Sequence, residues 1–544
     1  MPRWPLFIVA CLPVMWLLPP RGSAHCQQFP KSTCEQHTDF VPGHNLLGEG
    51  IDITTLERKG AHLVDTSRWL DPNDTCVLCR NPLMDDQLQR LPLAGVDWGV
   101  HPLCDRQVSS SIEHFDGDVA NVLAEEVKNN WKVELDFPEE FESVAIGQVV
   151  LVGSRSEMVS YAHEKTQEDR YSFVRHEISC ELYWLRLHPS PTLLSPHFAH
   201  DAQNLPSEYD PEEYHDFIDT YGTHYVSQAQ LGGRVRSLVP VRTCAATLAG
   251  IRVSDIKNCL SLITSLGWVS LLLSRRCREL LSNQAGAVFW EADDQRHIEG
   301  VGGSSQEKLL FPGFGKARLF SEWRKNITMN PGVVSHSLLP IHTLLERGDP
   351  RREMLKRSVS DYITQRALWW NCINYCPDGS YANLRKYCKC LCYPDAFTDS
   401  ACCPRERGLA HLQVHIRKAS GLQGDPFPFS ASDAFVKVFF QGRGKRTRFI
   451  TDNNNPNWSE TLDFGPVKLT GLNYIEVQVW DKDVWEDDHL ATCYKSLVAG
   501  GTSWVKCHAA HGHVDYYYVL TCMANLGGPT CRDYVPQRQY WVSK

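Results

Sequence analysis

Cysteine placement constrains the fold of this chain more than any other feature of its sequence. The 544 residues contain 21 cysteines, and seven of them lie between Cys372 and Cys403. A segment with so many cysteines cannot build a conventional apolar core and depends on disulfide bonds for its stability. We therefore predict a small disulfide-stapled module over residues 370–408, placed between larger domains.

The first 24 residues predict a secretory signal peptide, because a basic start is followed by a short apolar run and small residues. A transmembrane anchor is the weaker alternative, since the apolar run is short. The even number of cysteines after the leader favours disulfides in a secreted protein, and the length predicts three or four domains. Asn73, Asn326 and Asn457 occupy glycosylation sequons. The formal net charge of −9 argues against a nucleic-acid partner.

The region before the cysteine cluster, residues 25–369, mixes helical and strand patterns. Residues 131–137 alternate strictly between apolar and charged side chains, which predicts a strand. In "EEYHDFIDTYGTHY" one helical face carries Tyr214, Phe217, Ile218 and Tyr221. Gly222 should end this helix, and residues 224–231 then resemble a strand.

The region after the cluster predicts an all-β domain. From residue 409 to about 525, short alternating segments are separated by loops, which indicates an antiparallel β-sandwich. Two acidic groups lie at loop positions, Asp425 and Asp433 in one, and Asp481, Asp483, Asp487 and Asp488 in the other. Calcium takes six to eight oxygen ligands, and two converging loops can supply them. Two solvated acidic loops are the alternative interpretation.

The segment "NNNPNWSETLDF" between these loops resembles C2 domains, which bind membranes through calcium. The resemblance implies Ca²⁺ ligands at Asp425, Asp433, Asp481, Asp483, Asp487 and Asp488. Phe427, Phe429 and Trp485 lie in the same loops, and large exposed apolar side chains there are expected to contact lipid. The alternative is that they fold back on the sandwich. Crowding of like charges should raise the carboxyl pKa values and weaken calcium binding in an acidic compartment.

The stretch "YGTHYVSQAQLGGR" is similar to the signature of the membrane attack complex/perforin (MACPF) family. The match includes an EGF-like module and a terminal C2 domain, and it runs over nearly the whole mature chain. It implies an α+β multidomain protein, whose MACPF domain holds a bent four-stranded antiparallel sheet and two helical clusters. The expected domains are a signal peptide (1–24), a MACPF domain (25–369), the EGF-like module (370–408), an all-β C2 sandwich (409–525) and a tail (526–544).

The resemblance also implies a function and a set of signature residues, Tyr221, Gly222, Thr223, His224, Gly232 and Gly233. The two adjacent glycines are expected where the sheet bends and would act as a hinge. The expected activity is calcium-dependent docking on target-cell membranes, assembly of a homo-oligomeric ring, and insertion of β-hairpins. The pore would admit granule proteases, and the protein would be stored in cytolytic granules and secreted.

The segments expected to insert are residues 143–178 and 254–300. A barrel strand crosses the bilayer with about 9–11 residues that alternate between lipid and lumen. Residues 258–274 carry no charge and form an apolar block, which departs from the alternating pattern of the family.

The resemblance further implies a set of disulfide bonds. The implied pairs are Cys26–Cys79, Cys34–Cys76, Cys104–Cys180, Cys244–Cys403, Cys259–Cys277, Cys493–Cys507 and Cys522–Cys531. Further disulfide cysteines are expected at Cys372, Cys388, Cys376, Cys390, Cys392 and Cys402.

Enzymatic activity is not expected, because the sequence contains no G-x-S-x-G, H-E-x-x-H or glycine-rich phosphate motif. Two other functions remain open. The chain could be a non-lytic, calcium-dependent membrane-binding relative, or a terminal complement component, which shares the central signature.

Overall fold

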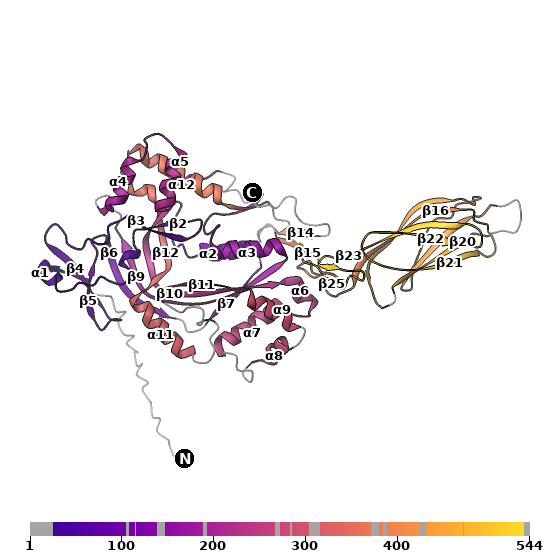
Figure 1. Ribbon diagram of the computed structural model, residues 1–544, viewed down its shortest axis with the longest axis horizontal. Helices are drawn as coiled ribbons and strands as arrows, with labels where there is room; N and C mark the ends of the chain where they lie inside the picture. The colour runs from indigo at the N-terminus through magenta and orange to yellow at the C-terminus, as the bar shows by residue number, and fades with distance from the viewer. Residues whose placement is uncertain are drawn as a thin grey trace, which may run out of the picture.

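A computed structural model describes residues 26–104, 108–114, 116–138, 147–188, 193–266, 273–282, 285–303, 310, 316–371, 380–383, 389–423, 431–471 and 473–537. These residues form a mixed α and β body, followed by a two-sheet β-sandwich that extends away from it (Figure 1). The expected combination of a mixed domain and an all-β C-terminal domain is confirmed.

Two long antiparallel strands, β9 (Tyr171–Leu187) and β10 (His224–Arg242), form the centre of the main sheet. The outer edge of β9 pairs with β6 (Gly95–Cys104) and β7 (Ser109–Glu113), and that of β10 with β12 (Gly332–Pro340) and β11 (His297–Val301). The sheet is thus four strands wide, with each outer position divided between two segments. The short strands β2 (Glu49–Asp52) and β3 (Glu57–His62) extend it beside the start of β10. The strands curve over their length (Figure 1).

Two helical clusters cover opposite faces of the β9–β10 pair. The first contains α2 (Asp116–Ala124) and α3 (Glu157–Glu168), with β8 (Gly147–Val150) paired to β13 (Leu368–Asn371). The second contains α6 (Thr243–Leu248), α7 (Val253–Leu266), α8 (Arg275–Ser282) and α9 (Ala285–Asp294). The first cluster shares a core with Phe173, and the second with the adjacent Val174. Successive residues of a strand face opposite sides, so the two clusters are separated by the sheet.

The remaining helices and strands of the body surround this sheet. They include α1 (Lys31–Cys34), α4 (Pro196–Asn204), α5 (Pro211–Tyr221), α11 (Lys316–Met329), α12 (Pro350–Arg366) and a small sheet of β1 (Cys26–Pro30), β4 (Thr75–Asn81) and β5 (Gln87–Leu91). Helix α5 begins at an Asp210 cap, whose carboxylate accepts from two backbone N–H groups, and ends at Gly222 in the left-handed region, φ +80°. The four apolar side chains expected on one face are all buried.

Residues 131–137 are not a strand, although they alternate in sequence. They form a turn followed by chain without regular secondary structure, and Glu134 has φ +61°. The Trp131 ring packs edge-on against His224, with ring centroids 5.8 Å apart. The apolar side chains thus pack against the body without strand pairing, and periodicity alone did not distinguish these arrangements.

The C-terminal sandwich consists of two four-stranded sheets. One has the order β19 (Asn457–Lys468), β16 (Leu409–Ser420), β23 (His513–Cys522), β22 (Thr502–His508), and the other β18 (Arg443–Arg446), β17 (Ala434–Phe440), β20 (Tyr474–Asp481), β21 (Asp488–Ser496). Alternate residues of both sheets meet in one apolar core. A hairpin of β14 (Ser380–Asn383) and β15 (Lys389–Cys392) lies before the sandwich.

The structure contains eight disulfide bonds among its described residues. Seven are the pairs that the resemblance implied, and the eighth joins Cys392 to Cys402. The expected cysteines Cys372, Cys376 and Cys388 lie outside the described residues. The Cys244–Cys403 bond ties the start of α6 to the segment before the sandwich.

Candidate functional site

The first half of the signature anchors α5 and β10 to their neighbours. The Tyr221 hydroxyl donates to Asp201 at 2.6 Å, and the ring packs in the apolar core. A Cβ on Gly222 would lie 2.6 Å from the Ile51 carbonyl oxygen, so close backbone approach and a left-handed φ both require glycine there. Tyr221 and Gly222 therefore fix the angle between the helix and the long strand that follows it.

The second half of the signature binds backbone atoms of distant segments. The Thr223 hydroxyl accepts from the Ile53 N–H at 3.0 Å, and His224 Nε2 lies 3.0 Å from the Trp131 carbonyl oxygen. Burial lowers the pKa of His224 to about 3, so the ring is neutral at physiological pH. A buried neutral histidine bound to a backbone carbonyl is a structural junction.

The glycine pair lies where the register of the sheet changes. The β9–β10 pairing contains a register shift between Leu231 and Gly232. A Cβ on Gly232 would lie 2.0 Å from the Cys180 carbonyl oxygen of β9. Neither glycine has a positive φ, so glycine is required by close approach rather than by a left-handed backbone.

Helix α11 crosses the sheet at the second glycine. A Cβ on Gly233 would lie 2.5 Å from the Trp323 ring and 2.6 Å from Ile327. Gly302 and Gly303, just after β11, are held against the same place, where the Gly302 carbonyl accepts from the Trp323 indole at 3.2 Å. Helix α11 therefore packs directly on the backbone of β10 at the glycine pair. The hinge role of the glycines remains a prediction.

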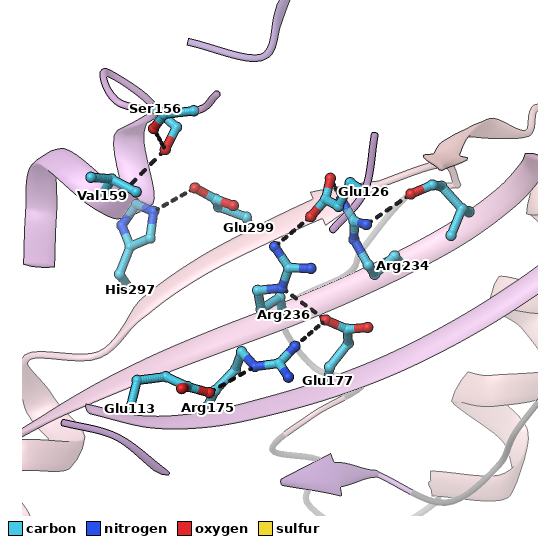
Figure 2. Close-up of polar contacts among 12 residues, drawn as sticks. Glu113, Glu126, Ser156, Val159, Arg175, Glu177, Arg234, Arg236, His297 and Glu299 are labelled. Carbon is cyan, nitrogen blue, oxygen red and sulfur yellow. Dashed lines mark hydrogen bonds and ion pairs between the residues drawn. The ribbon is translucent and has the colours of Figure 1, made fainter. Parts of the chain in front are cut away.

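A ladder of ion pairs crosses the sheet beside the first cluster, and sequence reasoning missed it (Figure 2). It runs Glu113, Arg175, Glu177, Arg236, Glu126 and Arg234, with N–O distances of 2.8–3.5 Å. Burial would raise the pKa of Glu177, but Arg236 and Arg234 hold it below its usual value. Because Arg236 and Glu177 are direct cross-strand partners, the ladder fixes the β9–β10 register and holds the segment after α2 on the sheet.

The two segments expected to insert are continuous with the long strands. Helix α3 ends at Glu168 and β9 begins at Tyr171, while β10 ends at Arg242 and α6 begins at the next residue. Helix α9 ends at Asp294 and leads into β11 at His297. Residues 258–266 of the atypical apolar block lie in α7, and residues 267–272 of the block lie outside the described residues. Across the part of the chain that the structure describes, no helix is long and apolar enough to span a bilayer.

Two of the expected calcium ligands meet at one end of the sandwich. Asp433 precedes β17 and Asp481 ends β20. The Asp481 carboxylate accepts from the Asp433 N–H at 2.6 Å and is almost fully buried, and the Asp433 carboxylate accepts from the Asp452 N–H at 2.7 Å. Asp488 begins β21 directly opposite Asp481 in the strand register. The sandwich therefore holds two of these carboxylates by backbone N–H groups.

The other expected ligands are arranged less favourably. Lys482 donates to Asp487 and holds the pKa of that carboxyl below its usual value, which is opposite to the rise expected from crowding. Asp483 is half-buried in the same loop, and Asp425 lies outside the described residues. Among the residues described, no three carboxylates here come within 4.8 Å of one another. The donors are oxygen atoms, as calcium prefers, but the loops would have to close further to hold an ion.

Exposed apolar side chains lie at this end of the sandwich, and an exposed basic strand lies beside the other half of β17. Trp485 is 98% exposed, so it does not fold back on the sandwich, and its neighbour Val484 is 95% exposed. Phe427 and Phe429 lie outside the described residues. All four residues of β18 (Arg443–Arg446) are exposed. The three glycosylation sequons, at Asn73, Asn326 and Asn457, are exposed as well.

A buried carboxylate connects the two large domains. Asp169, directly after α3, accepts from the Asn525 side chain at 3.2 Å, from the Gln537 N–H at 3.1 Å and from the Tyr534 hydroxyl. Arg170 donates to the Ala401 carbonyl. The chain after the sandwich thus returns to the junction of the first helical cluster and β9.

These features define a class of protein in which a bent sheet, with a helical cluster on each face, is joined to a C2-type sandwich. The chain belongs to the MAC/Perforin family, whose domain model matches residues 40–370, and a C2 domain model matches residues 410–507. It is 38% identical to human Perforin-1, over 94% of this chain and 93% of that protein, and 38% identical to mouse Perforin-1, over 96% and 95%. Human complement component C7 is 27% identical over 55% of this chain and 34% of its own length.

Proposed function

We propose that this protein is a secreted, calcium-dependent, pore-forming cytolysin. The observation that carries the proposal is the continuity of both helical clusters with β9, β10 and β11, in a chain similar to Perforin-1 over nearly its full length. If α3 and the helices α6–α9 unfold, their residues can extend the existing strands while the pairing between β9 and β10 is kept. At about 3.3 Å per residue, the 14 residues of α7 span more than the hydrocarbon core, which is about 30 Å thick.

Docking precedes insertion in this proposal. Asp433, Asp481 and Asp483 supply carboxylate oxygens at one end of the sandwich, and the exposed Trp485 lies in the loop between β20 and β21. Calcium between the loops would offset the repulsion between the carboxylates and fix the apolar side chains for entry into lipid. The basic strand β18 would add attraction to anionic headgroups, about 1 kcal/mol per basic residue near the surface.

Oligomerisation completes the proposal. Docked monomers join through the edges of their sheets, and the extended hairpins form a β-barrel that admits granule proteases to the target cell. Barrel closure leaves no unpaired strand edge in the lipid. The longer and closer similarity to Perforin-1 favours this function over that of a complement component.

A calcium-titrated dye-release assay with anionic vesicles tests the proposal. The wild-type protein should release dye only with calcium, and Asp483→Ala should need at least about tenfold more calcium, since it loses one ligand. Glu476→Gln, in the same strand as Asp481 but near its other end, is the matched control and should behave as wild type. Calcium-dependent binding without release would instead identify a non-lytic membrane-binding protein.

A further inference from the structure

Three metal-ligating side chains converge outside the sandwich, on the first helical cluster. Glu157, His297 and Glu299 each offer one ligand atom, and these atoms all lie within 4.8 Å of one another. His297 Nε2 and the Glu299 carboxylate are 3.2 Å apart. Figure 2 shows this histidine and Glu299 on β11, facing the start of α3. The trio joins positions about 140 residues apart in sequence.

The positions of these side chains are fixed by the surrounding structure. Glu157 is the first residue of α3, whose start is capped by Ser156, and the Ser156 hydroxyl accepts from the Val159 N–H. His297 and Glu299 alternate along β11 and therefore share one face of the strand, which is paired to β10. The His297 ring stacks on Tyr161 of α3, with centroids 5.2 Å apart. Little rearrangement is needed to gather the three donors around one ion.

We propose that Glu157, His297 and Glu299 form a zinc-type divalent transition-metal site that pins α3 to β11. One imidazole nitrogen and two carboxylate oxygens suit Zn²⁺ or Co²⁺, and a water molecule completes four-coordination. Ca²⁺ and Mg²⁺ prefer all-oxygen shells, so this site is chemically distinct from the calcium loops. Binding replaces the His297–Glu299 hydrogen bond and requires the neutral imidazole.

The regulatory consequence rests on the proposed pore function. Helix α3 lies in the first segment expected to insert, and β11 follows the second. An ion between them stabilises the folded cluster and opposes its extension into strands. With zinc at ten times its Kd, the fraction of molecules with an unpinned α3 falls about tenfold. Zinc should therefore slow dye release by about that factor without reducing vesicle binding.

The metal site is tested by Co²⁺ titration of the full-length protein in calcium-free buffer at pH 7.4. Ligand-field absorption in the visible range should saturate in the wild type. Glu157→Gln, an exposed change on the helix surface, and His297→Ala should each weaken Co²⁺ binding more than about tenfold. His511→Ala, in the turn between β22 and β23, is the matched control and should keep the wild-type titration. Titrations of Glu157→Gln and His297→Ala that match the wild type overturn the site.

The pinning effect is tested by dye release at fixed calcium, with and without zinc. The rate of dye release without zinc, divided by the rate with zinc, should be about ten in the wild type and near one in Glu157→Gln. Both proteins should bind vesicles equally, as measured by sedimentation. Equal ratios in both proteins would overturn the pinning role. If the wild type releases no dye even without zinc, the pore function fails, while the Co²⁺ titration still decides the metal site.

Discussion

At the scale of single residues, the glycine pair is constrained by what it touches. A side chain on Gly233 would enter the space occupied by Trp323 and Ile327 of α11. We expect Gly233→Val to cost about 1–3 kcal/mol of stability by overpacking and to prevent the strand from straightening. The variant should bind vesicles with calcium but release little dye. Gly471→Val is the matched control because no atom lies within 4 Å of its Cβ position, and full lysis by Gly233→Val would contradict the hinge.

Buried histidines make the stability of the body depend on pH. Burial lowers the pKa values of His176, His336 and His342 to about 4 and that of His224 to about 3. The unfolded chain, with histidine pKa values near 6.5, therefore binds more protons between pH 6.5 and 4. The free energy of unfolding should be highest above pH 6.5 and fall with decreasing pH, by roughly 2 kcal/mol per histidine between pH 7.4 and 5.

Urea unfolding at pH 7.4 and 5, with the disulfides intact, measures this dependence. The difference in the free energy of unfolding between pH 7.4 and pH 5 should become smaller in His336→Leu, by the contribution of one histidine. The exposed His511→Ala should leave that difference unchanged. A body equally stable at both pH values would show that these rings are not neutral when folded.

At the scale of elements, polar contacts tie α3 to its neighbours, among them the contact of His163 with Asp116 of α2 at 2.7 Å. The Tyr161 hydroxyl donates to the Gln295 carbonyl, just before β11. Tyr161→Phe removes this bond, at a cost of about 1 kcal/mol, and keeps the ring stacked on His297. We expect dye release to become faster, because α3 leaves the sheet more easily. Tyr474→Phe, an exposed change in the sandwich, is the control, and slower release by Tyr161→Phe would argue against release of α3.

How far the sequence predicts an element depends on whether its contacts are local. Helix α5 was predicted together with its buried face, because the spacing of its apolar residues and the glycine that ends it both lie within the segment. Residues 131–137 carried an equally regular pattern, but strand formation needs a partner, and Trp131 packs on His224 instead.

The same difference between local and distant contacts decides how much of each site the sequence predicts. The acidic loops were visible in sequence, but the Lys482–Asp487 pair, which lowers the Asp487 pKa, was not expected. The ion-pair ladder left only a weak signal, charged residues two apart in each strand. Their partners depend on the cross-strand register, which sets Arg236 opposite Glu177.

At the scale of the whole molecule, the C-terminal segment couples the sandwich to the first helical cluster through Asp169. Tyr534→Phe leaves this buried carboxylate with one donor fewer, which should cost about 1–3 kcal/mol locally. Hydrogen exchange should become faster at the end of α3 and in residues 525–537. Tyr494→Phe, an exposed change in β21, should have no such effect. Unchanged protection in Tyr534→Phe would show that the segment does not restrain α3.

The central claim is that the helices on both faces of the sheet become strands in the membrane. A scan of an environment-sensitive fluorophore, placed one residue at a time along α3 and α7, tests this most directly. With calcium and vesicles, emission should shift to the blue at every second position, as lipid-facing and lumen-facing side chains alternate in a barrel strand. Two results would contradict the account, each observed while dye is released. In one, the emission shift repeats every 3.6 residues, as in a helix, and in the other, emission does not change at any position.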